Sequence, residues 1–212
     1  RSTRSSVVAG VLWLLSARPC DAHIPSAGNS TVPGHITLVG SHSALPDAGG
    51  AFTIVVRNLA NNPLGGLVVV LDFSGCTDLG LCADPLDPAA TVNCAAKTVS
   101  KITDVAGTVT FTLLGGSNGS GNATTLLNGV KIFGNGVQFG WPTASTLNLD
   151  GSNGVGINDL SVWLSDYGTL GNPPFGRSDF DGDGTLGIND LSVWMTGFGA
   201  GGSSQGCASI CP

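Results

Sequence analysis

Residues 179–190 read DFDGDGTLGIND, which places aspartates at positions 1, 3, 5 and 12 of a loop and glycine at position 6. A hard cation needs several oxygen ligands from one short segment, and alternate residues of a tight loop supply them. The glycine stands where such a loop must turn sharply. The spacing therefore predicts a calcium-binding loop, here named loop 2, with Asp in place of the usual Glu at its last position.

A degenerate copy, here named loop 1, lies upstream at residues 148–159 and reads NLDGSNGVGIND. Both copies run into the same stretch, GINDLSVW, at 156–163 and 187–194. Loop 1 keeps Asp at positions 3 and 12 but has Asn at position 1 and Ser at position 5. Because ligand charge tunes affinity, loop 2 is predicted to bind calcium more tightly. The alternative for either copy is an Asp/Gly-rich turn without metal.

The duplicated loop followed by a single helix resembles the dockerin type I repeat over about residues 145–200. The helices are expected at 158–167 and 189–198, with no full helix before either loop. The resemblance implies two half-EF-hands packed around a pseudo-twofold axis, with two Ca²⁺ ions. The ligands it implies for loop 2 are Asp179, Asp181, Asp183, the carbonyl of Thr185, and Asp190. Those it implies for loop 1 are Asn148, Asp150, Ser152, the carbonyl of Gly154, and Asp159.

Apolar residues recur along both expected helices at a spacing that fits a face packed on a partner. They are Leu160, Val162, Trp163 and Leu164 in the first helix, and Leu191, Val193, Trp194 and Met195 in the second. We expect the tryptophans to be core residues, since a small domain has few other large side chains to bury; the alternative is a docking surface. In cellulosomal dockerins the residues just before the last ligand recognise a cohesin partner. Here Ile-Asn pairs replace the polar Ser/Thr pair common in that family.

Residues 33–142 contain short runs rich in Val, Ile, Thr and Phe, separated by turn residues, which is the signature of strands. The expected strands are 35–40, 51–59, 67–74, 98–104, 108–114, 130–133 and 137–139. The phrases at 55–70 and 103–112 resemble the bacterial Ig-like domains of the invasin and intimin type. The chain is thus expected to be mainly β. An Ig-like antiparallel β-sandwich would occupy 33–142 and a small α dockerin-like domain 143–202, with an N-terminal extension at 1–32 and a cysteine-containing tail at 203–212.

Composition favours an extracellular protein. Charged residues make up only 10 % of the chain and hydrophobic residues 42 %, with a net charge of −6, so neither disorder nor nucleic-acid binding is expected. Six cysteines without a paired CxxC arrangement favour disulfides over zinc; they are Cys20, Cys76, Cys82, Cys94, Cys207 and Cys211. Cys207 and Cys211 are close enough in sequence to pair locally. The three cysteines at 76–94 cannot all pair among themselves, which leaves one for Cys20.

An uninterrupted apolar run lies at residues 7–15, after two arginines and before small residues. It has the features of a secretory signal and is too short to span a membrane. The alternative is a strand that enters a neighbouring subunit and completes its sheet edge, which would build a head-to-tail filament. The assembly residues would then be Val7, Val8, Val11, Leu12, Trp13, Leu14 and Leu15.

Motifs of catalysis are scarce. The histidines at 35 and 42 and Asp47 are candidate members of a triad, but no nucleophile-elbow sequence accompanies them. The sequence therefore predicts a non-enzymatic, secreted bacterial structural protein that assembles with other copies of itself at the cell surface. The alternative is a dockerin-type binding module or an adhesin, with a cohesin-like protein or a glycan as its partner.

Overall fold

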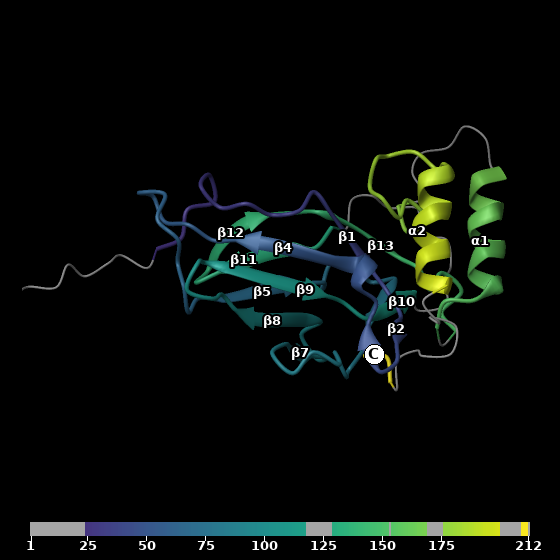
Figure 1. Cartoon of the computed structure of the whole chain (residues 1–212), viewed down its shortest axis with the longest axis horizontal. Helices are drawn as coiled ribbons and strands as arrows, with labels where there is room; N and C mark the ends of the chain where they lie inside the picture. The colour runs from purple at the N-terminus through teal and green to yellow at the C-terminus, as the bar shows by residue number, and fades with distance from the viewer. Residues whose placement is uncertain (1–23, 118–128, 153, 169–175, 200–208, 212) are drawn as a thin grey trace, which may run out of the picture.

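Strands make up most of the regular secondary structure, and two α-helices lie at one end of the molecule (Figure 1). The computed structural model describes residues 24–117, 129–152, 154–168, 176–199 and 209–211. The prediction of a mainly β protein is confirmed. The assembly residues at 7–15, and with them Cys20 and Cys207, lie outside the described residues.

The largest sheet is antiparallel and has five strands. Its central strand, β5 (Val68–Asp72), pairs with β11 (Lys131–Gly134) on one side and β8 (Thr98–Ile102) on the other. The edges are β12 (Val137–Gly140) and β7 (Thr91–Asn93). Alternate residues of β5 are buried because successive side chains point to opposite faces, and the buried face looks into the main core.

The antiparallel pair β4 (Ala51–Val55) and β9 (Thr108–Thr112) supplies a second layer over this core. Phe52 and Phe111, partners in the register, stack with ring centroids 5.7 Å apart. The largest fully buried side chains of the main core are Phe73, Phe111, Ile36, Leu38, Ile54, Leu71, Leu79, Leu81 and Ile132. Residues from both layers contribute, so the core lies between them.

Strand β1 (His35–Leu38) pairs with β13 (Thr143–Thr146) in parallel, which differs from the all-antiparallel expectation. Parallel neighbours need a long crossover, and here most of the β domain forms it. The predicted domain boundary after residue 142 falls directly before β13. The strand therefore joins the segment leading into loop 1 to the start of the β domain.

Several short strands escaped prediction because they are polar or glycine-rich. Strand β10 (Gly115–Ser117) pairs with β6 (Leu79–Leu81), and β2 (Ser41–His42) pairs with β3 (Leu45–Pro46). A single-turn 3₁₀ helix, η1 (Ala48–Gly50), follows β3. The predicted strands 35–40 and 51–59 are shorter in the structure, ending at residues 38 and 55.

The helices are α1 (Ile157–Gly168) and α2 (Ile188–Gly199), each one residue longer at both ends than predicted. The two tryptophans are buried, as expected, with 3 % exposure for Trp163 and 4 % for Trp194. They belong to a second core cluster formed by Val39, Cys82, Leu114, Leu147, Leu149, Val155, Trp163, Phe180 and Trp194. This cluster contains residues of the β domain, so the helices share a core with it. Within the described ranges, no helix has the length and apolar character needed to cross a membrane.

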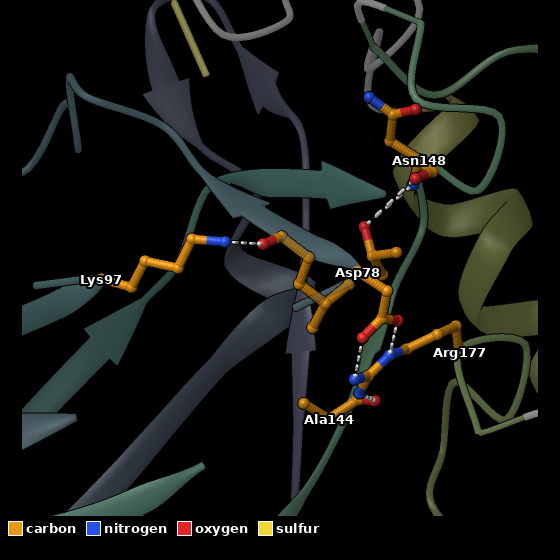
Figure 2. Close-up of polar contacts among 7 residues, drawn as sticks. Asp78, Lys97, Ala144, Asn148 and Arg177 are labelled. Atoms are coloured by element: carbon orange, nitrogen blue, oxygen red, sulfur yellow. Dashed lines mark hydrogen bonds and ion pairs between the residues drawn. The ribbon is translucent and has the colours of Figure 1, made fainter. Parts of the chain in front are cut away.

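A buried ion pair ties the segment before loop 2 to the β domain. Figure 2 shows Arg177 reaching Asp78 and the carbonyl of Ala144. The guanidinium donates from Nε and Nη2 to the two carboxylate oxygens, at 2.6 and 2.8 Å, which is a bidentate pair. Burial raises the pKa of Asp78, but the hydrogen bonds and charge of Arg177 more than offset this and hold it below its usual value.

The disulfide pattern corrects two predictions. Cys211 bonds to Cys94, 117 residues away, so the expected local pair of Cys207 with Cys211 is wrong. The sequence gives no sign of this because the tail returns to the sheet: Ile210 bridges Cys82 and the Cys211 N–H donates to Leu81. Cys82 is also disulfide-bonded, whereas Cys76 is a buried thiol, so the expectation that Cys76 forms a disulfide is wrong as well.

We expect Asp78→Ala to lower the free energy of unfolding by about 3–5 kcal/mol, because it leaves the Arg177 charge buried without its partner. Urea denaturation measures this loss. Asp87→Ala, which breaks the less buried pair with Lys101, is the control and should lose less. The double variant Asp78→Leu/Arg177→Met should recover much of the loss. Equal losses for the two single variants would contradict the assigned importance of the buried pair.

Candidate metal centre

Loop 2 brings together three of its predicted ligands. One carboxylate oxygen from each of Asp179, Asp181 and Asp183 lies within 4.8 Å of the others. Asp179 is buried at the base of the loop, and the other two are exposed. Three oxygens gathered around one point on the surface can coordinate a cation that retains several water ligands.

The loop backbone creates this convergence. Gly182 and Gly184 have φ values of 73° and 86°, a left-handed conformation that disfavours side chains. The turn points their N–H groups back at Asp179, whose Oδ1 accepts from Gly182 at 2.8 Å and whose Oδ2 accepts from Gly184 at 3.0 Å. Asp181 accepts from the N–H of Asp183 at 3.1 Å. Each aspartate therefore orders the residues that follow it.

Asp190 closes loop 2 from the first turn of α2. Its Oδ1 accepts from the N–H groups of Phe180 and Asp181, at 2.7 and 3.2 Å, and its Oδ2 accepts from Gly187 at 2.8 Å. The carboxylate thus joins both ends of the loop and lies where the helix N-terminus favours negative charge. Thr185 donates from both its N–H and its hydroxyl to Asp183 Oδ1, at 2.8 and 2.7 Å.

Burial and mutual repulsion disfavour the ionised form of the inner carboxylates of loop 2, so these groups are weaker acids than usual. Burial, together with the charges of Asp190 and Asp181, raises the pKa of Asp179 to about 6. Burial also raises the pKa of Asp190. In contrast, hydrogen bonds from the Thr185 hydroxyl and N–H lower the pKa of the exposed Asp183. A bound cation would favour the ionised form of all of them.

Loop 1 repeats the same backbone scheme with fewer charges. Asp159, in the first turn of α1, accepts from the N–H groups of Asp150 and Gly156, at 3.0 and 2.6 Å. Asp150 accepts from the N–H of Ser152 at 2.8 Å, and Gly151, the equivalent of Gly182, has a φ of 71°. Burial raises the pKa of Asp159 to about 6.

Asn148 is the feature of loop 1 that best fits a metal. Its side chain is buried, and its Nδ2 donates to the Ser152 carbonyl across the loop. Its Oδ1 is buried without a hydrogen-bond partner. A buried acceptor without a partner is unfavourable, and a cation ligand would satisfy it. The donor set in both loops consists of oxygen atoms, which suits Ca²⁺. Bound there, the ion would supply positive charge that links segments of the loop.

His35 and Ser145 lie at hydrogen-bond distance, 2.8 Å from Nε2 to Oγ, which is the geometry of a nucleophile and its base. However, Ser145 is fully buried, and Nδ1 contacts the hydroxyl of Thr143 instead of a carboxylate. Burial lowers the pKa of His35 to about 4, which keeps the ring neutral at pH 7. The Ser145 hydroxyl is therefore enclosed, whereas His35 is partly exposed. The candidate triad partner Asp47 instead caps η1 through the N–H of Gly49.

Sequence reasoning missed the support that β1 gives to loop 2. Thr37 donates from its hydroxyl to the Phe180 carbonyl at 2.8 Å, across 143 residues. A Cβ on Gly182 would lie 2.3 Å from Cγ of His35, so the loop backbone packs directly on the imidazole ring. No local sequence pattern predicts these contacts, because they form only where the β domain packs against the loop.

Both helices also expose apolar side chains at equivalent positions of the repeats. In α1 these are Ile157, Leu164 and Tyr167, and in α2 they are Ile188, Met195 and Phe198. The aromatic members stack on the buried tryptophans, Tyr167 on Trp163 at 5.1 Å and Phe198 on Trp194 at 4.9 Å. Leu164 and Met195 were expected to pack against a partner, but the structure places them on the surface.

No protein-family model, curated protein or solved structure matches this chain.

We expect calcium binding to loop 2 to weaken as pH falls from 7 to 5. A ligand must be deprotonated to bind the ion, and Asp179, with its pKa raised to about 6, gains a proton over this range. Near pH 6 the binding of Ca²⁺ should therefore release about half a proton from this residue. Calorimetry in two buffers of different ionisation enthalpy measures both quantities. An affinity that stays constant between pH 5 and 7 would contradict the role of Asp179.

Proposed function

We propose that the protein is a secreted, non-enzymatic structural protein whose two C-terminal loops bind Ca²⁺ and so hold the helices in place. The observation that carries the proposal is the convergence of Asp179, Asp181 and Asp183 within 4.8 Å in a loop of matching ligand spacing. Such a cluster repels itself without a cation, and both helices begin at these loops. Calcium would thus act on the fold of the whole C-terminal region.

An extracellular location is part of the proposal. The Cys94–Cys211 disulfide and the second bonded cysteine, Cys82, favour an oxidising compartment. Only 10 % of the residues are charged, and millimolar calcium outside the cell suits a site with few carboxylates. The proposed fold is an Ig-like β-sandwich followed by a dockerin-like pair of half-EF-hands.

The contacts between the repeats support the half-EF-hand pair. Trp163 of α1 donates from its indole to the carbonyl of Ser178, directly before loop 2. The equivalent contact in the other direction is apolar: Leu147, directly before loop 1, lies against Gly197 of α2. Each helix therefore packs on the entry to the other repeat's loop, as a pseudo-twofold arrangement requires.

Self-assembly is the finer part of the proposal. It rests on the apolar run at residues 7–15, which would complete a neighbouring subunit's sheet edge. Residues 25 and 31 bridge Asn58 and Val55, so the chain after this run lies along the β4 side of the domain. A strand donated from there reaches a different part of the next copy, and such head-to-tail contacts produce a filament.

A docking module is a second candidate function, and the exposed apolar positions of the helices favour it. Ile157 and Ile188 are 64 % and 76 % exposed and precede the last ligand of each loop. Two equivalent faces, each with three large apolar side chains, would suit a cohesin-like protein partner. Because calcium orders the helices in both proposals, calcium binding alone does not distinguish them.

We expect removal of calcium to lower the melting temperature by about 5–10 °C from its value at a calcium concentration of about 100 Kd, because the ion binds the native state. Differential scanning calorimetry with and without chelator measures the shift. Asp181→Ala should reproduce much of it in the presence of calcium. The matched control is Asp84→Ala, since Asp84 and Asp181 each accept the N–H two residues ahead. An unchanged melting temperature in excess chelator would refute the calcium proposal.

Electron microscopy of the purified protein separates the two functions. Filament assembly predicts fibres without any added partner, and a folded, calcium-binding monomer after deletion of residues 1–22. Fibres formed by the deleted protein would refute strand donation. The docking function predicts a monomer that binds an added cohesin module, and a loss of that binding in Ile157→Asp/Ile188→Asp.

A further inference from the structure

We propose that strand β1 positions loop 2 for calcium, so that Thr37 and His35 of the β domain help to set the affinity of this site. The inference rests on the proposed calcium function and extends the binding site beyond the loop-and-helix repeats. It assigns positioning roles to residues that lie more than 140 positions before the ligands.

The contact point is Phe180, the residue between the first two ligands of loop 2. Its N–H donates to Asp190 Oδ1 at 2.7 Å, and its carbonyl accepts from the Thr37 hydroxyl at 2.8 Å. Its side chain is 1 % exposed within the second core cluster. The N–H, the carbonyl and the side chain of Phe180 are therefore all fixed, and this limits the orientation of the flanking residues Asp179 and Asp181.

A chain of hydrogen bonds fixes Thr37 in turn. Ser145 of β13 donates to the Thr37 hydroxyl oxygen at 3.1 Å, which uses the only hydrogen of its hydroxyl. His35 Nε2, 2.8 Å from the Ser145 oxygen, is then the donor, and Nδ1 accepts from Thr143. The hydrogen bonds run in one direction, from the ring through two hydroxyls to the loop carbonyl, and such chains strengthen each bond.

His35 also limits the path of the loop. Gly182, at position 4 of the loop, lies so close to the ring that a Cβ would sit 2.3 Å from Cγ. The left-handed Gly182 sends its N–H to Asp179. The ring of His35 therefore packs against the turn that orients the first ligand and limits the position of its backbone.

Loop 1 has a different anchor. The Asn148 carbonyl accepts from the N–H of Ser117 in β10 at 2.8 Å, and the Asn148 side chain packs on Gly116. The contact to Ser117 comes from the backbone, and the hydroxyl of Thr146 in β13 also contacts Asn148, 3.3 Å from its N and 3.5 Å from its carbonyl oxygen. Thr37 instead donates to the Phe180 carbonyl of loop 2. A change at Thr37 should for this reason affect loop 2 alone.

Pre-ordering has a consequence for affinity. A loop already held in its binding conformation loses less freedom when the ion arrives, so its affinity is higher. Linkage makes the effect reciprocal: if β1 favours the bound loop, calcium must stabilise the docking of β1. The β domain and the calcium site would then respond to each other.

The test is Thr37→Val, which keeps the shape of the side chain and removes its hydroxyl. We expect the calcium affinity of loop 2 to fall about three- to ten-fold, the effect of one hydrogen bond, and Thr37→Ser to restore it. Titration calorimetry measures the affinity in an Asp150→Asn background, which weakens loop 1. Thr53→Val is the control, because it removes a hydroxyl contact with Thr110 that joins strands β4 and β9 and does not involve loop 2.

Amide hydrogen exchange of residues 179–190 in calcium-free protein gives a second readout. Thr37→Val should speed exchange there, and Thr53→Val should not. Wild-type affinity and exchange in Thr37→Val, or equal changes in both variants, would overturn the role of β1. If the wild type binds no calcium, the proposed function fails, and the exchange comparison still decides whether β1 orders the loop.

Discussion

Loop 2 must gather several like charges in one place, and the surrounding structure is arranged around that constraint. Asp179, Asp181 and Asp183 lie within 4.8 Å of one another, a distance at which carboxylates repel. Short-range donors offset part of this repulsion. The N–H groups of Gly182 and Gly184 turn toward Asp179, and loop N–H groups donate to Asp190, which lies in the first turn of α2. The remaining repulsion is what a bound cation would offset, since a loop fully satisfied by its own N–H groups would gain little from an ion.

The two repeats show which parts of this solution are indispensable. Both keep the aspartate at the helix start and a left-handed glycine at position 4, Gly151 or Gly182, because these close the loop with or without full charge. The contacts outside the loops have diverged. Ser178 donates to the buried Asp166 of α1, whereas the equivalent pair, Leu147 and Gly197, is apolar. Likewise the indole of Trp163 has a partner, while that of Trp194 is buried without one. The loop geometry is therefore more constrained than the packing that supports it.

The parts predictable from sequence are those that local residues determine. Helix boundaries were correct to one residue. Each helix begins two residues before the last aspartate of its loop and ends at a glycine, Gly168 or Gly199. Strands such as β5 were found from their runs of β-branched residues. By contrast, β13 and β10 are short and polar, and they are extended because they pair with the neighbouring strands β1 and β6. The Cys94–Cys211 bond also depends on where the tail docks, and cysteine spacing carries no information about that.

The same distinction applies to the site. The proposed ligand residues can be predicted from the sequence because one loop supplies them, but the residues proposed to orient them come from the other end of the chain. Thr37 is one threonine among many in a β-rich segment, and its hydroxyl acquires significance only through the parallel pairing of β1 with β13. That pairing places a row of polar side chains, His35 and Thr37 of β1 with Thr143 and Ser145 of β13, next to the loop. A loop-and-helix repeat on a different support would keep the same ligands and lose this row, so identical ligand sets need not give identical affinities.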